Sequence, residues 1–365
     1  MILRAKRLGL YNYRNLSSLQ KNNRELNYTE MVTNKDVLDS YPQRIVFELT
    51  NACNLNCVMC GRMAKTFYPT YLDYEIVQWL AKFDVLNFID EVTLMGWGEP
   101  TLYPRFEELL EFLSIFQCRK YLCTNGMLLQ KYGEAIVKNG VDLLAVSVNG
   151  ADETTNDTLR RGSKLSSILR GIQEVHSYSQ SSEMIISFVF CVMKSNYKQL
   201  PSLVELAHNY GVKRVKAVHL TAFSCAMVSE LLWNCTDELS SVFDEAAQLA
   251  MKYDIELELP YLQGTDPAGS DLHAYCSMPW RDMFIGSDSK IRPCMSSSQV
   301  LLKIDVEKMS FFDVWNSSEY IALRQTVNSE NMPKPCSKCY QSSFCNWNLR
   351  NAYYQISEDF AHEWK

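Results

Sequence analysis

The sequence lacks an apolar run of about 18 residues or more, the length that a membrane-spanning helix needs. Its first residues, MILRAKRLGLYNYRN, are basic but carry neither the apolar block nor the small-residue cleavage site of a secretory signal peptide. It also lacks an excess of basic residues, since the formal net charge is -6. We therefore expect a cytoplasmic protein whose partners include neither nucleic acid nor a membrane.

Histidine is scarce, with five residues in a chain of 365, and none stands in a context that predicts a Ser/His/Asp triad. No G-x-G-x-x-G pattern follows the first expected strand, which weakens the alternative of a nucleotide-binding sheet. The length suffices for one large α/β domain and a smaller appendage.

Six short apolar runs predict β-strands, and the segments between them have the apolar spacing of helices. Strands that alternate with helices pair in parallel through right-handed crossovers. We expect an α/β fold, namely a partial (β/α)6 TIM-like barrel followed by a small C-terminal α+β domain. The active site of such a fold lies at the carboxyl ends of the strands. The runs are residues 44–49, 90–95, 119–123, 142–148, 185–193 and 214–220.

The expected domain organisation has three parts. Residues 1–40 form an N-terminal extension, residues 41–262 form the core, and residues 263–365 form the C-terminal domain. Two alternatives stay open for the extension, which is either a surface helix or a cover on the substrate side.

Cysteine is abundant, with thirteen residues, although thiols in the cytoplasm stay reduced and grouped cysteines there more often bind metal than form disulfides. Cys53, Cys57 and Cys60 follow the first expected strand in the pattern C-x3-C-x2-C. Thiolates at this spacing can converge on an iron–sulfur cube, and three ligands for four irons leave one iron open for chemistry. The alternatives are a structural zinc site with a distant fourth ligand and a chance grouping.

This loop resembles that of the radical S-adenosylmethionine (SAM) enzymes, and the resemblance covers about residues 42–220. In that family the loop holds a [4Fe-4S] cluster whose open iron binds SAM. The residue before the last cysteine often touches the adenine, a role that falls here to Met59.

GWGEP, residues 96–100, looks like the family's G-G-E motif, which binds the SAM ammonium. The resemblance makes Glu99 the anion and lets the backbone carbonyls of Gly96 and Gly98 approach SAM. Trp97 stands where a glycine is usual.

Two further stretches resemble the family. Residues 147–162 match the region where the fourth strand offers a polar side chain to the ribose and a later arginine binds the SAM carboxylate. These roles fall to Ser147 and Arg160, with Arg161 as the alternative alignment. CTNG, residues 123–126, also fits the family, but an ordinary Asn-Gly turn explains it equally well.

The resemblance implies that the reduced cluster cleaves SAM to a 5′-deoxyadenosyl radical, which abstracts hydrogen from a substrate carbon. Cluster potentials span roughly -700 to +450 mV, and this reaction needs the low end. A flavodoxin or a ferredoxin is the expected electron donor.

A second group of cysteines lies near the C-terminus, where two separated thiols precede a C-x2-C-x5-C pattern. It resembles the SPASM/twitch extension of radical SAM enzymes, which carries one or two auxiliary [4Fe-4S] clusters. Too few cysteines remain for the full SPASM pattern, so a single twitch-like cluster is expected, with Ser289 at the usual glycine of its hairpin. A zinc ribbon is the structural alternative. The expected ligands are Cys276, Cys294, Cys336 and Cys339, with Cys345 as an alternate.

Three functions follow from these features. The preferred one is an oxidoreductase that dehydrogenates a small molecule such as a sugar or cyclitol in a biosynthetic pathway. The alternative is a maturase that epimerises, cross-links or oxidises a ribosomal peptide, and the last is a non-enzymatic iron–sulfur or zinc protein. An epimerase must return a hydrogen atom to its substrate, and Cys225 is the candidate donor, with a packed loop thiol as the other interpretation.

Overall fold

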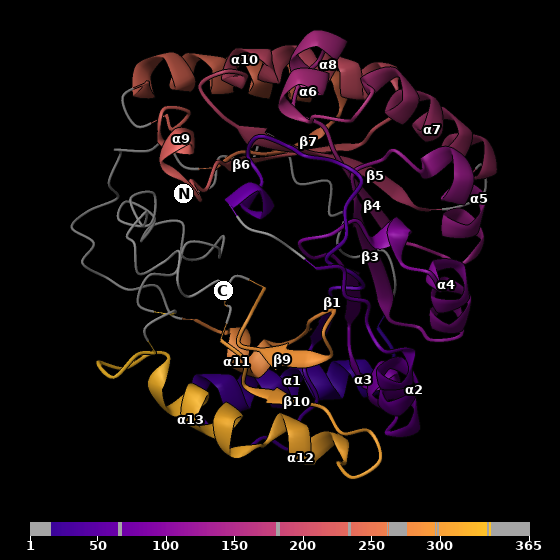
Figure 1. Cartoon of the computed structure of the whole chain (residues 1–365), viewed down its shortest axis with the longest axis vertical. Helices are drawn as coiled ribbons and strands as arrows, with labels where there is room; N and C mark the ends of the chain where they lie inside the picture. Colours follow the sequence, from indigo (N-terminus) through magenta and orange to yellow (C-terminus); the bar gives the residue numbers. More distant parts are fainter. Residues whose placement is uncertain are drawn as a thin grey trace.

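In the described part of the chain, ten strands form one curved sheet, and helices cover its convex face (Figure 1). The computed structural model describes residues 16–64, 68–179, 183–232, 235–260, 262, 276–295, 297, 299–333 and 336. Across the sheet the strand order is β10-β9-β8-β1-β2-β3-β4-β5-β6-β7.

All six expected strands are present, and neighbours pair in parallel from the first to the last. This confirms the α/β fold class. The strands are β1 (Arg44–Phe47), β2 (Glu91–Leu94), β3 (Arg119–Thr124), β4 (Leu143–Ser147), β5 (Ile185–Val192) and β6 (Arg214–His219).

Two further parallel strands extend the sheet beyond these six. β7 (Glu256–Glu258) pairs with β6, and β8 (Asp282–Ile285) pairs with β1 on the opposite side. β9 (Lys290–Arg292) and β10 (Leu302–Lys303) then continue from β8 in antiparallel pairing. The segment that carries the C-terminal cysteines is therefore hydrogen-bonded directly to the first strand of the core.

The hydrophobic core lies between the sheet and its outer helices. Side chains alternate across β5, so that Ile186, Phe188 and Phe190 pack into this core while Ser187 lies on the inner face. The helices and short 3-10 turns of the parallel units are η2 (Gly61–Ala64), α2 (Tyr74–Lys82), α3 (Val85–Phe88), η3 (Pro100–Leu102), α4 (Phe106–Ser114), α5 (Leu129–Lys138), α6 (Glu153–Leu159), α7 (Leu165–Tyr178), η4 (Tyr197–Gln199), α8 (Leu200–Asn209), α9 (Cys225–Val228) and α10 (Thr236–Tyr253).

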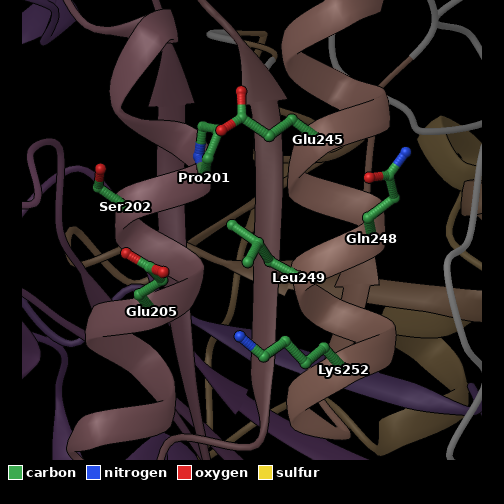
Figure 2. Close-up of a pocket in the computed structure, with 7 residues that line it drawn as sticks. All are labelled: Pro201, Ser202, Glu205, Glu245, Gln248, Leu249 and Lys252. Atoms are coloured by element: carbon green, nitrogen blue, oxygen red, sulfur yellow. The ribbon is translucent and has the colours of Figure 1, made fainter.

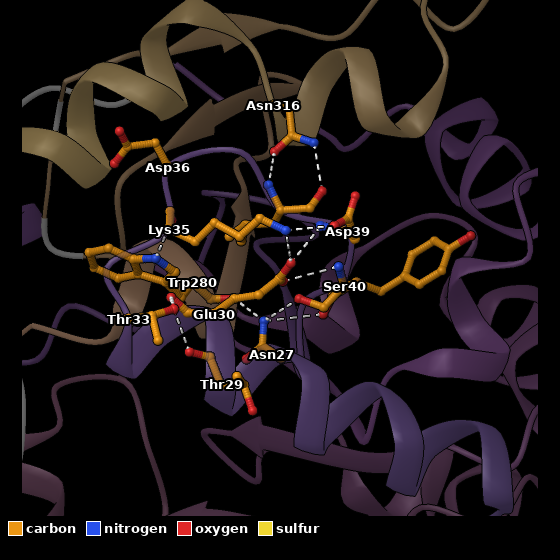
Figure 3. Close-up of polar contacts among 12 residues, drawn as sticks. Asn27, Thr29, Glu30, Thr33, Lys35, Asp36, Asp39, Ser40, Trp280 and Asn316 are labelled. Carbon is orange, nitrogen blue, oxygen red and sulfur yellow. Dashed lines mark hydrogen bonds and ion pairs between the residues drawn. The ribbon is translucent and has the colours of Figure 1, made fainter.

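Helix α1 (Ser18–Val32) packs at the amino ends of the strands through a buried face that is polar. Asn27 Nδ2 donates to the carbonyl of Trp280 at 2.7 Å and to Ser40 Oγ at 2.9 Å. Glu30 accepts from the backbone N–H of Asp39 at 2.8 Å and from that of Ser40 at 3.1 Å (Figure 3). The helix thus ties the segment before β1 to the segment before β8. It lies at the end of the sheet opposite the carboxyl ends of the strands.

The C-terminal helices α11 (Met278–Arg281), α12 (Phe311–Trp315) and α13 (Ser318–Thr326) pack beside α1 (Figure 1). Trp280, Trp315 and Tyr320 are fully buried there. Burial lowers the pKa of Arg324 to about 10, and its guanidinium donates to the carbonyls of Pro279, Asp36 and Trp315.

A groove lies on the outer surface of the sheet layer. α8 and α10 leave a groove between them, lined by residues such as Glu205, Glu245 and Lys252, on the outer side of the sheet (Figure 2). In the part of the chain described, no helix combines the length and apolar character that crossing a bilayer requires.

Candidate active site

The loop that carries Cys53, Cys57 and Cys60 follows β1 at the carboxyl ends of the strands. All three thiols are reduced and half-buried. Two backbone hydrogen bonds hold the loop against the chain that follows α6, with Asn56 N–H donating to Arg161 O and Val58 N–H to Leu159 O, both at 2.9 Å. The predicted ligands therefore share one loop at the expected end of the sheet.

Burial raises the pKa of the Cys57 and Cys60 thiols, and Arg160 opposes this at Cys57. Only a thiolate binds iron, so the nearby guanidinium favours the form that ligates. Within the described residues, no three His, Cys, Asp or Glu side chains are grouped to hold a single metal ion. A cubane cluster differs from a single ion, because each thiolate binds a different iron.

Arg160 is 5% exposed, and its Nε has no hydrogen-bond partner among the described residues. Arg161, in contrast, is exposed and contributes only its backbone carbonyl to the cysteine loop. A buried guanidinium with an unpartnered Nε beside the ligand loop fits an anionic group such as the SAM carboxylate. The structure thus brings Arg160, and not the side chain of Arg161, to the site.

Glu99 is 2% exposed and accepts four hydrogen bonds from the ends of two strand connections. Its donors are Thr101 N–H and hydroxyl at 3.2 and 2.7 Å, and Thr124 hydroxyl and Asn125 N–H, both at 2.6 Å. The carboxylate therefore fixes the chain after β2 to the end of β3. Its predicted contact with the SAM ammonium stays a prediction.

Gly98 lets the GWGEP loop lie directly on the cysteine loop. A Cβ at this position would lie 2.1 Å from the carbonyl oxygen of Thr50 and 2.5 Å from that of Ala52. Any side chain would force the two loops apart, which explains why glycine occupies position 98.

Asn125 of the CTNG stretch is a site residue that the sequence did not single out. Its Nδ2 donates to Asn54 Oδ1 at 2.7 Å and lies 3.9 Å from Cys53 Sγ. Its Oδ1 accepts from Met127 N–H at 2.9 Å, which forms an ordinary Asx turn. The Asn125 side chain therefore makes an ordinary turn and also contacts the cysteine loop, while the family role of CTNG stays a prediction.

Asn149, two residues after Ser147, was also missed. Its Nδ2 contacts Met59 Sδ at 3.8 Å, and its Oδ1 accepts from Cys191 N–H at 2.8 Å. Ser147 itself is half-buried and hydrogen-bonds the thiol of Cys123. Both asparagines follow the end of a predicted strand, and this position could have indicated that they lie at the site, since the carboxyl ends of parallel strands converge.

Trp97 connects the GWGEP loop to the segment after β6. Its ring packs edge-to-face on Phe223, with centroids 5.5 Å apart. Phe223 follows β6 and precedes α9, which begins with Cys225. The side chain of Cys225 is outside what the structure describes, so its role as a hydrogen donor stays a prediction.

The C-terminal cysteines bracket the β8–β9 hairpin. Cys276 precedes α11 and exchanges two hydrogen bonds with the side chain of Asn328, at 2.8 and 3.1 Å. Cys294 follows β9, and Cys336 donates its backbone N–H to Pro333 O. All three are half-buried, while Cys339 and Cys345 lie outside the described residues.

Comparison with known families agrees with this geometry. Residues 47–207 match the radical SAM superfamily, and residues 276–340 match the iron–sulfur cluster-binding domain named SPASM. The protein is therefore a radical SAM enzyme whose radical SAM domain binds SAM and a [4Fe-4S] cluster and is followed by a SPASM domain, which binds auxiliary iron–sulfur clusters.

Individual relatives are distant but span most of the chain. The tungsten-containing aldehyde ferredoxin oxidoreductase cofactor-modifying protein of Pyrococcus furiosus is 22% identical over 83% of this chain and 88% of its own. The AdoMet-dependent heme synthase of Methanosarcina barkeri is 24% identical over 88% and 95%. The structure of Streptococcus suis SuiB bound to precursor peptide SuiA superposes with a TM-score of 0.61 at 18% identity, over 83% of this chain and 71% of that one, which is a likeness of fold.

Proposed function

We propose that this enzyme oxidises its substrate by abstracting a hydrogen atom from a carbon, after which the substrate radical releases a proton to solvent and passes one electron to an auxiliary cluster. Bound SAM and the [4Fe-4S] cluster supply the hydrogen-abstracting radical. Cys53, Cys57 and Cys60 hold that cluster, and Arg160 holds the SAM carboxylate. Four C-terminal thiols hold a single auxiliary cluster, namely Cys276, Cys294, Cys336 and Cys339, with Cys345 as the alternate.

The pairing of β8 with β1 is the observation that carries this proposal. Four residue pairs, from Arg44 with Asp282 to Phe47 with Ile285, join the strand before the cysteine loop to the strand between Cys276 and Cys294. An oxidation needs an acceptor for the second electron at a fixed distance from the substrate. Direct strand pairing supplies such a fixed relation between the two cysteine groups.

A polar small molecule such as a sugar or cyclitol is the proposed substrate. On the inner face of the sheet, β6 carries the half-exposed Lys216, whose Nζ lies 3.2 Å from Glu258 Oε1 on β7. Such donors and acceptors suit a hydroxylated ligand better than an apolar one.

A ribosomal peptide is the second candidate substrate. The observation that favours it is the fold shared with SuiB, whose structure contains a precursor peptide. A flavodoxin or ferredoxin is the proposed electron donor for either substrate.

Mass spectrometry of the product tests the proposed oxidation. Reduced enzyme in deuterated water, supplied with SAM and candidate cyclitols or precursor peptides, should give a product two hydrogens lighter with no solvent deuterium at the reacting carbon. Deuterium at that carbon, lost in Cys225→Ala, would instead establish epimerisation with Cys225 as the donor and would overturn the oxidation.

A further inference from the structure

Glu48, the residue after β1, is a buried carboxylate with two strand connections bound to it. Trp97 N–H of the GWGEP loop donates to its Oε1 at 2.8 Å. The backbone N–H and hydroxyl of Ser287 donate to its Oε2 at 3.2 and 2.9 Å. One side chain, 7% exposed, therefore joins the loop after β2 to the tip of the β8–β9 hairpin.

The hydrogen bond from Trp97 N–H to Glu48 also fixes the direction of the Gly96 carbonyl. Every described peptide bond is trans, so the Gly96 carbonyl points away from the Trp97 N–H across one rigid plane. Gly96 also packs on Glu48, because a Cβ there would lie 2.4 Å from Glu48 Cγ. Glu48 thus sets the direction of a carbonyl that is predicted to approach the SAM ammonium.

The bonds to Ser287 fix the hairpin at its tip. The Ser287 hydroxyl also lies 2.7 Å from the hydroxyl of Thr70. Gly286 N–H donates to Lys290 O at 2.9 Å and closes the turn. The two arms of this hairpin lead back to Cys276 and forward to Cys294.

We propose that Glu48 is a positioning residue that couples SAM binding at the GWGEP loop to the hairpin between Cys276 and Cys294. This rests on the proposed function, in which that hairpin serves the auxiliary cluster. SAM restrains the Gly96 carbonyl, and through the Trp97 amide and the Glu48 carboxylate it restrains Ser287. Coupling is reciprocal, so loosening the hairpin weakens SAM binding by the same factor.

Two substitutions break the connection from opposite sides. Glu48→Gln keeps the shape of the side chain but places an amide donor against one of the N–H or O–H donors. Ser287→Ala removes the hydroxyl that contacts Glu48 and Thr70, keeps the backbone N–H bond to Glu48, and leaves the GWGEP loop intact. The matched control is Ser289→Ala, because the Ser289 hydroxyl accepts from Asp73 N–H at 3.3 Å in the same hairpin and does not contact Glu48.

The experiment uses the full chain with reconstituted clusters under anaerobic conditions. Equilibrium binding gives the Kd for SAM, and hydrogen exchange with mass spectrometry follows the amides of residues 284–290 with and without saturating SAM. In the wild type and in Ser289→Ala, SAM slows this exchange. Glu48→Gln weakens SAM binding roughly fivefold or more and loses the slowing at saturation. Ser287→Ala weakens SAM binding about twofold and shows a smaller slowing than the wild type, because its backbone N–H still bonds Glu48.

Three results overturn the coupling. These are a wild-type hairpin whose exchange does not change with SAM, a hairpin in Ser287→Ala that responds to SAM as fully as in the wild type, or SAM affinity in Ser287→Ala equal to that of the wild type. If Glu48→Gln does not assemble its clusters, Ser287→Ala alone decides. No substrate is present in these measurements, so their failure is distinct from a failure of the proposed oxidation, which the product mass tests.

Discussion

Two neighbouring arginines have different positions in this protein, and the sequence comparison assigned one role to Arg160 with Arg161 as the alternative alignment. Arg160 ends α6 and turns its side chain into the interior, where it lowers the pKa of Cys57 against the effect of burial. Arg161 is exposed, and its backbone carbonyl holds the cysteine loop. Only the Arg160 side chain is buried beside the cysteine loop, so we propose that it, and not Arg161, binds SAM.

Replacing Arg160 by Ala should weaken SAM binding by more than tenfold, because a hydrogen bond to a charged group contributes about 1.5–3 kcal/mol. Arg161→Ala is the matched control and should bind SAM as the wild type does, since its backbone bond to Asn56 remains. Anaerobic binding titrations measure both. Equal losses in the two variants would contradict the assignment.

The cluster ligands give a second residue-scale prediction. Replacing Cys53, Cys57 and Cys60 together by Ala should abolish the formation of 5′-deoxyadenosine from SAM with dithionite, because no thiolate then holds the cluster. Cys118→Ala is the control, since this buried thiol belongs to the core and not to the loop. Product formation by the triple variant would refute the ligand assignment.

Some of the site residues can be predicted from the sequence, and others cannot. Cysteines at C-x3-C-x2-C spacing are rare enough to predict a site, and the structure places all three on one loop. Asn125 and Asn149 were not predicted as site residues, because asparagine after a strand is an ordinary turn residue. Their contacts with Cys53 and Met59 depend on strands meeting in space.

The strands also differ in whether the sequence predicts them. The six predicted strands are apolar runs of four residues or more, and this pattern was sufficient to predict them. β7 has the sequence ELE, so its three residues carry no such pattern. β8 is a short run, DMFI, inside the cysteine-rich segment, where it was assigned to the appendage rather than to the core sheet.

Helix α1 has no apolar stripe to detect, because its buried residues are Gln20, Asn23, Asn27 and Glu30. Its attachment depends on side-chain bonds to backbone carbonyls, such as Gln20 Nε2 to Ile89 O at 2.7 Å. Such bonds require the tertiary structure, so periodicity does not predict them.

Asn27→Ala should lower the free energy of unfolding by about 1–3 kcal/mol, because the carbonyl of Trp280 and the side chain of Gln43 lose a buried partner. Tyr28→Ala is the control on the same helix, since Tyr28 is 58% exposed. Urea unfolding followed by tryptophan fluorescence measures both. Equal midpoints for Asn27→Ala and the wild type would show that the polar face adds no stability.

At the scale of the whole molecule, the two cysteine groups belong to one continuous sheet. β8 lies beside β1, and Glu48 joins their carboxyl ends through Ser287. Backbone pairing of β8 with β1 therefore joins the described start of the SPASM segment to the radical SAM core. This arrangement is what an auxiliary electron acceptor requires.

The metal content of the whole chain is the last prediction. Two cubanes imply about eight irons and eight sulfides per chain, whereas a C-terminal zinc ribbon implies about four irons and one zinc. In the Cys276→Ala/Cys294→Ala variant, about half of the iron should be lost while reductive SAM cleavage persists, because Cys53, Cys57 and Cys60 still hold the first cluster. Elemental analysis together with 5′-deoxyadenosine assays on the same preparation decides this. A wild-type chain with four irons and one zinc would eliminate the auxiliary cluster and, with it, the electron acceptor on which the proposed oxidation depends.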